Sequence, residues 1–165
     1  MKIVIAGGTG LIGSKVAARL RRRGIEHVVA SRATGVNTFT GEGLARALEG
    51  ADVVVDVTNS SYTDYAGAQE FFATSTLNLL SYGAAAGISH HVALSVVGTD
   101  RLASSEGGYF AAKLEQERLI RASGHAHSIV HATQFFEFLL SIAEAATRDG
   151  VVRVAHAQVQ PRAAD

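Results

Sequence analysis

The chain opens on Lys2-Ile3-Val4-Ile5-Ala6, which runs directly into Gly7-Gly8-Thr9-Gly10-Leu11-Ile12-Gly13. The first run is typical of a short buried strand, and the second is a glycine-rich turn that opens a helix. Its glycines fit G-x-G-x-x-G and equally G-x-x-G-x-x-G, spacings that let backbone N–H groups and the positive end of a helix dipole approach a pyrophosphate. The stretch therefore predicts a dinucleotide-binding turn. The residues expected to contact the dinucleotide are Gly7, Gly8, Thr9, Gly10, Leu11, Ile12 and Gly13.

Two other interpretations of this turn are open. The interval from Gly8 to Gly13 has the glycine spacing of a P-loop, but Ser14-Lys15 follows, whereas a P-loop has its lysine before the hydroxyl. This order disfavours triphosphate binding. The glycines can also serve only the close packing of strand against helix, with no ligand.

Composition limits the class of protein. At 165 residues, one domain is expected over 1–165, and equal counts of Lys+Arg and Asp+Glu predict no affinity for nucleic acid or anionic membrane. The absence of cysteine excludes a disulfide framework and a thiolate metal site. The start of the chain is unlike a secretory signal, and no apolar stretch is long enough to span a bilayer. A cytoplasmic protein is the expectation.

Strand and helix patterns alternate along the chain. Strands are expected over 26–32, 36–39, 52–57, 91–97 and 128–132, and helices over 44–49, 67–86 and 109–122. The run over 52–57 is almost continuously apolar, which is typical of a strand covered on both faces. The pattern predicts an α/β fold with a doubly wound, mostly parallel sheet, the Rossmann fold.

Two loops at strand ends are candidates for further cofactor contacts. An NAD-selective site places an acidic residue near the end of the second strand, but this chain has Ser31 and Arg32 there. A guanidinium can bind a 2′-phosphate, so NADP (as NADPH) is favoured over NAD. Alternatively, Arg32 is an exposed loop charge and the site accepts both cofactors. Thr58, Asn59 and Ser60 follow the 52–57 strand, where they can line the cofactor.

A third set of residues is a candidate for proton transfer to a substrate. Tyr109 and Lys113 are four residues apart and share one face of a helix, and Ser95 ends the preceding strand. A neighbouring ammonium is expected to lower the pKa of the Tyr109 phenol, and Lys113 can also bind ribose hydroxyls. Ser95 can donate to a substrate oxygen. Alone, Tyr-x-x-x-Lys is a frequent coincidence on amphipathic helices.

In combination, these motifs resemble the short-chain dehydrogenase/reductase superfamily over essentially the whole chain. The nearest likeness is to its atypical NmrA-like NAD(P)-binding branch, which includes NADPH-linked quinone reductases and redox-sensing regulators. The likeness is carried by Gly7–Gly13, Leu77-Asn78-Leu79-Leu80, Leu94-Ser95-Val96-Val97-Gly98 and Gln134-Phe135-Phe136-Glu137-Phe138.

By this resemblance, Ser95, Tyr109 and Lys113 correspond to the catalytic triad and Arg32 to the phosphate-reading position. Gly7, Gly10 and Gly13 correspond to the cofactor turn. The helical asparagine of the family has no match by spacing at Asn59 or Asn78. Members of the branch usually extend well beyond 165 residues, so most of the substrate lobe is expected to be absent from this chain.

Other residues allow two uses. Phe135 and Phe136 follow the last strand and can stack on a nicotinamide or an aromatic substrate, although packing of the next helix is the commoner use of such rings. His125, His127 and His131 lack the carboxylate or thiolate partners of a metal site, so no metal is expected. The helix that carries Phe71 and Phe72 can form a homodimer or pack within a monomer.

The sequence thus predicts an oxidoreductase that transfers hydride from NADPH to a small-molecule carbonyl or quinone. A different class remains open, a regulator that senses NADP(H) and binds a protein partner without turnover. A nucleotide-sugar epimerase or dehydratase is the third possibility, because the same triad serves those reactions.

Overall fold

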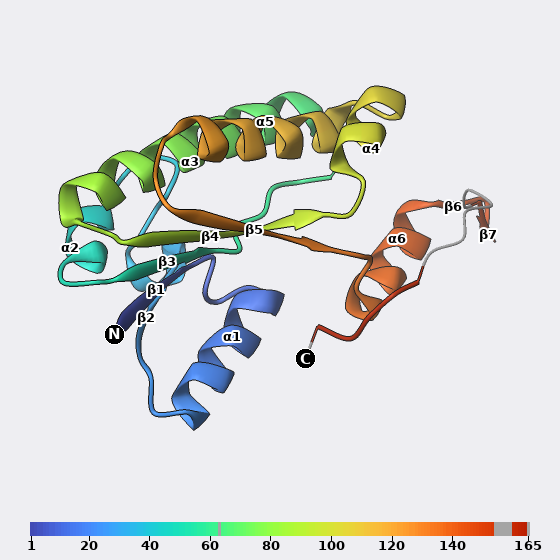
Figure 1. Ribbon diagram of the computed structural model, residues 1–165. Coiled ribbons are helices and arrows are strands. Elements are labelled where there is room, and N and C mark those ends of the chain that lie inside the picture. The colour runs from blue at the N-terminus through green and yellow to red at the C-terminus, as the bar shows by residue number, and fades with distance from the viewer. Residues whose placement is uncertain (63, 154–159, 165) are drawn as a thin grey trace.

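The computed structural model describes residues 1–62, 64–153 and 160–164. Its centre is a five-stranded parallel sheet in the order β2-β1-β3-β4-β5 (Figure 1). The strands are β1 (Lys2–Ala6), β2 (Glu26–Ala30), β3 (Val53–Asp56), β4 (His90–Val96) and β5 (His127–Ala132). The helices are α1 (Leu11–Arg22), η1 (Arg32–Thr34), α2 (Leu44–Leu48), α3 (Tyr65–Ala86), α4 (Thr99–Ser105) and α5 (Gly108–Ala122).

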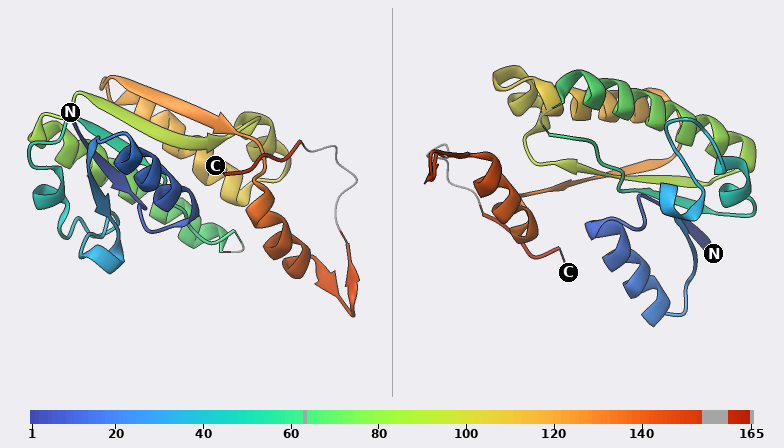
Figure 2. Two further views of the ribbon diagram at one scale, coloured as in Figure 1. Left: turned by 90° about the horizontal axis from the view of Figure 1, so that it is seen from below. Right: turned by 180° about the vertical axis from the view of Figure 1, so that it is seen from behind.

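Helices cover both faces of this sheet, as expected for a doubly wound fold. Helix α1 lies on one face, and α3 and α5 lie side by side on the other (Figures 1 and 2). Alternate residues of β1 serve the two faces, because successive side chains of a strand point in opposite directions. Ile3 and Ile5 pack with Ala17 of α1, whereas Val4 packs with Leu48 and Leu79 on the α2 and α3 side. The predicted Rossmann fold is confirmed.

The expected strand over 36–39 is wrong. This segment forms turns and irregular backbone between η1 and α2. The side-chain amide of Asn78, on α3, donates to the carbonyl oxygens of Thr38 and Phe39 at 2.9 and 2.8 Å. Because a side chain on a distant helix satisfies these backbone groups, the segment needs no strand partner.

Helix boundaries follow local capping. Helix α3 begins at Tyr65, two residues before the expected start, because the Asp64 carboxylate accepts a hydrogen bond from the N–H of Gly67 at 3.0 Å. It ends at Ala86, and the following residue, Gly87, caps it with a φ of 74°, the left-handed conformation. The short helix α4 was not expected from the sequence.

The C-terminal part extends away from the sheet beyond β5 (Figures 1 and 2). It contains η2 (Phe136–Phe138), α6 (Leu139–Ala145), β6 (Thr147–Arg148) and β7 (Val151–Val152). Arg162 returns to this region, where its carbonyl accepts from Phe136 N and its N–H donates to Gln134, each at 2.9 Å. None of the helices in the described ranges combines the length and apolar character needed to cross a membrane.

Candidate cofactor and active site

The glycine turn lies at the carboxyl end of β1, and three of its glycines are required by packing. Gly7 has φ of 78°, and a Cβ there would lie 2.8 Å from the Val57 carbonyl oxygen. A Cβ on Gly13 would lie 2.3 Å from the Gly7 carbonyl oxygen, and one on Gly8 would lie 2.8 Å from that of Ile5. These contacts let α1 start close to the sheet, as the packing interpretation requires.

Gly10 differs from the other three. It is exposed, has ordinary backbone angles, and a Cβ there would meet only the Gly7 carbonyl oxygen, at 3.2 Å. Gly10 is also the N-cap of α1, and among the described residues no side chain caps this helix end or places an acid in its first turn. The positive end of the helix dipole, at Leu11 and Ile12, is therefore open to an anion.

The second-strand candidates lie beside this turn. The N–H groups of Gly7 and Gly8 donate to the carbonyl of Ala30, the last residue of β2, at 2.9 and 3.2 Å. Ser31 and Arg32 follow directly, and the Ser31 N–H donates to the Thr34 hydroxyl at 2.9 Å. Arg32 is exposed. The turn and this cation therefore lie at the same edge of the sheet.

The loop after β3 contacts both the glycine turn, through Val57, and the catalytic candidate Tyr109, through Asn59. Thr58 donates to the Asp56 carboxylate through its N–H at 3.0 Å and through its hydroxyl at 2.7 Å, which fixes the start of the loop. Asn59 Oδ1 accepts a 2.7 Å hydrogen bond from the Tyr109 hydroxyl. Ser60, the third expected residue of this loop, is partly buried.

Tyr109 lies among aromatic rings at the start of α5. Its ring centroid is 4.9 Å from that of Tyr62 and 5.6 Å from that of Phe72. Burial, with a smaller contribution from Tyr62, raises the pKa of Tyr109 to about 12. The expectation of a lowered phenol pKa is wrong, because desolvation dominates and the Lys113 ammonium is held elsewhere.

The Lys113 ammonium points into the core. Lys113 is 3% exposed, and its Nζ donates to the Leu94 carbonyl at 2.7 Å and to Oε1 of Gln116. The same Nζ lies 4.6 Å from the centre of the Phe72 ring, a cation–π distance. Burial lowers the pKa of Lys113 to about 8, against the opposing attraction of Asp56 and Glu117.

Ser95 is also turned inward. It lies on the buried face of β4, and its hydroxyl donates to Oε1 of Glu117 at 2.5 Å. Glu117 accepts from Arg121 at 2.6 Å and pairs with His131 Nε2 at 3.1 Å. Burial raises the pKa of Glu117, but the hydrogen bonds from Ser95, Arg121 and His131 outweigh it and leave the pKa below its usual value. Ser95 and Tyr109 therefore direct their hydroxyl protons to different partners.

The phenylalanine candidates lie farther along, where the chain leaves β5. Phe135 packs against Phe138 with centroids 6.2 Å apart and forms a bridge with Arg162. The Phe136 side chain is exposed. The neighbouring Glu137 forms a 3.4 Å ion pair with Lys15 of α1. The structure thus places these rings in the C-terminal region, whereas Tyr109 packs against Tyr62 and Phe72 at the start of α5.

Sequence reasoning missed the buried polar residues behind the site: Asp56, Gln116 and Glu117. A signal for them existed. Asp56 interrupts the apolar run over 52–57, and Gln116 and Glu117 follow Lys113 by three and four residues, on the same helical face.

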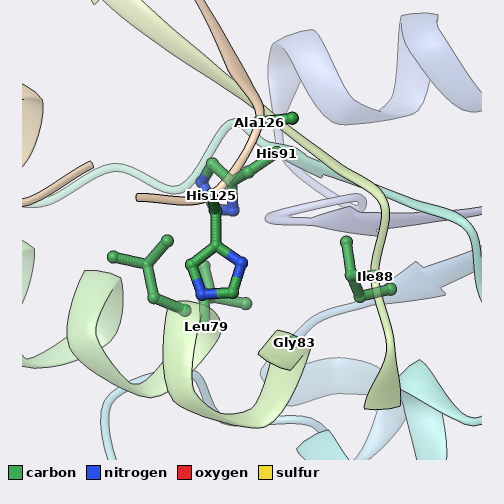
Figure 3. Close-up of a pocket in the computed structure, with 7 residues that line it drawn as sticks. Leu79, Gly83, Ile88, His91, His125 and Ala126 are labelled. Atoms are coloured by element: carbon green, nitrogen blue, oxygen red, sulfur yellow. The ribbon is translucent and has the colours of Figure 1, made fainter. Parts of the chain in front are cut away.

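One further feature lies apart from this site. A small pocket is lined by Leu79, Leu80, Gly83, Ile88, His91, His125 and Ala126 (Figure 3), near the amino ends of β4 and β5. Ligands of parallel α/β sheets bind at the opposite, carboxyl edge. Within the described part of the chain, His, Cys, Asp and Glu side chains form no cluster of three or more able to hold a metal ion.

Comparison with known proteins identifies relatives of this arrangement. The chain is 30% identical over 163 residues to a (4-alkanoyl-5-oxo-2,5-dihydrofuran-3-yl)methyl phosphate reductase of Streptomyces griseus, a match that covers 92% of this chain and 54% of the relative. This chain therefore spans about half the length of that relative.

Solved structures share the fold. A short-chain dehydrogenase/reductase superfamily protein of Agrobacterium tumefaciens with bound NAD matches with a TM-score of 0.67 and 21% identity, over 82% of this chain and 50% of the other. An NADPH-dependent quinone oxidoreductase of Escherichia coli, complexed with NADPH, gives 0.61 and 20%, over 88% and 53%. A UDP-glucose 4-epimerase of Thermotoga maritima gives 0.69 and 16%, over 82% and 56%.

The model of the NAD-dependent epimerase/dehydratase family matches residues 3–138, which include the glycine turn, Asn59, Tyr109 and Lys113. The resemblance to short-chain dehydrogenases/reductases is thereby confirmed at the level of the superfamily, with a fold built to bind NAD(P). The chain belongs to the NAD-dependent epimerase/dehydratase family.

Proposed function

We propose that this domain binds NADPH and supports hydride transfer to a small-molecule carbonyl or quinone. One observation carries the proposal: the uncapped N-terminus of α1 at Gly10 and the hydrogen bond between Asn59 and Tyr109 lie at the same edge of the sheet. The matched relative of Streptomyces griseus is named a reductase, and a structural neighbour is named a quinone oxidoreductase. The reductase name of the relative at 30% identity favours reduction, whereas the family model and the UDP-glucose 4-epimerase structure keep epimerisation as an alternative.

Each candidate has a role in this proposal. The N–H groups at the start of α1 bind the pyrophosphate, and Arg32 binds the 2′-phosphate that distinguishes NADPH from NADH. Thr58, Asn59 and Ser60 line the bound cofactor, which supplies the hydride. The Tyr109 phenol is protonated near neutral pH, and in this proposal it donates its proton to the substrate oxygen. Its raised pKa in the cofactor-free form makes it a weaker acid, so the donor role requires that the pKa falls when the cofactor is bound.

Lys113 and Ser95 have supporting roles. With a pKa of about 8, the Lys113 ammonium is mostly charged near neutral pH. Its Nζ is bound to the Leu94 carbonyl in the core, so it donates to a ribose hydroxyl only once the side chain turns toward the cofactor. Ser95 orients the substrate oxygen once its hydroxyl turns away from Glu117. Phe135 and Phe136 follow the carboxyl end of β5, and the ion pair between Glu137 and Lys15 holds this segment beside α1, so in this proposal their rings contact the substrate from that side.

Replacement of Tyr109 by Phe tests the proposal. We expect NADPH oxidation with an accepted carbonyl or quinone to fall about 100-fold or more, because the proton donor is lost. NADPH affinity, measured by calorimetric titration, should stay within about twofold, because the ring packing is kept. Tyr82→Phe on α3 is the matched control and should retain activity. Unchanged oxidation in Tyr109→Phe would contradict the proposed role.

A second function is favoured by the inward side chains. Ser95 donates to Glu117 and Lys113 donates to Leu94 and Gln116, so neither is set for chemistry in this conformation. We infer as the alternative a sensor that binds NADP(H) and a protein partner without turnover. It predicts different affinities for NADPH and NADP⁺ in calorimetry and no loss of NADPH absorbance with any acceptor.

A further inference from the structure

Three polar side chains are almost fully buried between the sheet and α5. Asp56, at the end of β3, is 1% exposed, and Gln116 and Lys113, one turn apart on α5, are 2% and 3% exposed. Removing a carboxylate and an ammonium from water is costly unless each finds partners. The buried carboxylate and ammonium therefore each need hydrogen-bond partners inside the protein.

The three side chains form one continuous chain of hydrogen bonds. Gln116 Nε2 donates to Oδ2 of Asp56 at 2.9 Å, and Oε1 of the same amide accepts from Lys113 Nζ. The other Asp56 oxygen is held by Thr58. A side-chain amide has donors on one side and an acceptor on the other, so Gln116 can join a carboxylate to an ammonium in this orientation only.

The amide also keeps the two charges apart. Lys113 Nζ reaches the Asp56 carboxylate through Gln116, while its own backbone partner is the Leu94 carbonyl on β4, at 2.7 Å. With the Gln116 amide between the two charges, the Lys113 ammonium lies at the Leu94 carbonyl and over the Phe72 ring. The negative charge of Asp56 still raises the pKa of Lys113, against the effect of burial. The other acid that acts on Lys113 is Glu117, whose oxygens are taken by Ser95, Arg121 and His131.

We propose that Gln116 is the positioning residue for Lys113: its amide holds the ammonium at the Leu94 carbonyl and couples its charge to the buried Asp56 carboxylate. The catalytic meaning of this role rests on the proposed function, because Lys113 is the candidate that meets the cofactor. The coupling itself is a property of the folded protein and can be measured without cofactor or substrate.

The experiment is a titration of the Lys113 side chain by NMR. The sequence contains three lysines, Lys2, Lys15 and Lys113, so protein labelled with ¹³C-lysine gives three side-chain signals that Lys2→Arg and Lys15→Arg assign. In the wild type we expect a midpoint near 8. In Gln116→Met and in Asp56→Asn we expect it to fall by about one pH unit, because the charged form loses an acceptor or its counter-charge.

Two further variants serve as a control and as a second test of the coupling between Lys113 and the buried carboxylate. Gln69→Met makes the same chemical change on the exposed surface of α3 and should leave the midpoint unchanged. In the double variant Asp56→Asn/Gln116→Glu, the carboxylate moves next to the ammonium at constant total charge, so the midpoint should rise above that of the wild type. This variant also decides the matter if Gln116→Met does not fold.

Unchanged midpoints in the folded single variants would overturn the proposal, and so would a midpoint in the double variant at or below the wild-type value. A structural role for Gln116 alone would lower stability and leave the Lys113 titration in place. Failure of the proposed function is a separate result: wild-type protein would bind no NADPH in calorimetry, while Lys113 still responded to Gln116 and Asp56 as described.

Discussion

At the scale of single residues, the glycines of the first turn have different tasks. Gly7, Gly8 and Gly13 are required because any side chain would collide with neighbouring backbone. Gly10 has one contact of this kind, at 3.2 Å, and is exposed at the start of α1. Packing therefore explains three of the glycines, whereas the open surface at Gly10 is the part that suits a phosphate group.

Two alanine substitutions separate these tasks. Gly13→Ala should lower the free energy of unfolding by about 1–3 kcal/mol, because its Cβ would lie 2.3 Å from the Gly7 carbonyl oxygen. Gly10→Ala should change stability by less than about 1 kcal/mol, as expected for an exposed N-cap, but should weaken NADPH binding about tenfold. Urea unfolding and calorimetric titration give the two values. Equal loss of stability in both variants would contradict this division.

In the proposed function, Arg32 is the residue that we expect to distinguish NADPH from NADH. Arg32→Ala should weaken NADPH binding about tenfold, because a charge-assisted contact to the 2′-phosphate is lost, and should leave NADH binding nearly unchanged. Parallel calorimetric titrations with the two cofactors measure the ratio, and Arg46→Ala on α2 is the control. Equal affinities for NADPH and NADH in the wild type would instead support the interpretation of Arg32 as a loop charge.

At the scale of elements, β4 carries polar groups on its buried face. His91 and Ser95 point to the same side as Ala93, with exposures of 3% or less. Ser95 has Glu117 as its partner, whereas among the described residues the buried Nε2 of His91 has no hydrogen-bond partner. Burial lowers the pKa of His91, Asp56 opposes this effect, and His125, His127 and His90 add to it.

This burial predicts a loss of stability in mild acid. Because the folded pKa of His91 is below the unfolded value of 6.5, the unfolded chain binds more protons once the pH falls below 6.5. The free energy of unfolding should therefore decrease from 6.5 down to the folded pKa, by up to about 1.4 kcal/mol per pH unit. Urea unfolding at a series of pH values measures the slope. His91→Gln, which cannot titrate, should flatten it, and an identical slope would exclude His91 as its source.

At the scale of the whole molecule, α3 and α5 present an outer surface with apolar side chains. A groove between them is lined by Leu77, Leu80, Ser81, Ala84, Leu119, Ala122, Ser123 and His125. The Leu77 side chain is 49% exposed. Phe71 and Phe72 pack within the monomer. The homodimer that the sequence leaves open would therefore bury this outer face of α3 and α5 instead, which removes its apolar side chains from water.

Sedimentation equilibrium tests the dimer. The wild type should approach twice the monomer mass of 17.2 kDa as concentration rises, and Leu77→Glu should shift it to the monomer, because a carboxylate in an apolar interface loses its hydration. Val151→Glu also replaces an exposed apolar side chain by a carboxylate, on β7, and should leave the association unchanged. A wild type that stays monomeric at every concentration would contradict the proposal.

The sequence by itself determined the alternation of the five sheet strands with most of the helices, the parallel sheet and the position of the glycine turn. These follow from local signals, since apolar periodicity and glycine spacing act over a few residues. The strand expected over 36–39 failed because its backbone partner, Asn78, comes from a helix 40 residues away. The local pattern of apolar and polar residues cannot indicate a contact between residues so far apart in the sequence.

Only the tertiary structure decided where the functional side chains point. Tyr109 meets Asn59 across 50 positions, and Gln116 meets Asp56 across 60. The sequence could place Tyr109 and Lys113 on one helical face, but the direction of the Lys113 ammonium depends on Leu94, Gln116 and the Phe72 ring. The pKa of a buried group is set by desolvation and by the charges that folding brings near, and both exist only once distant segments have packed together.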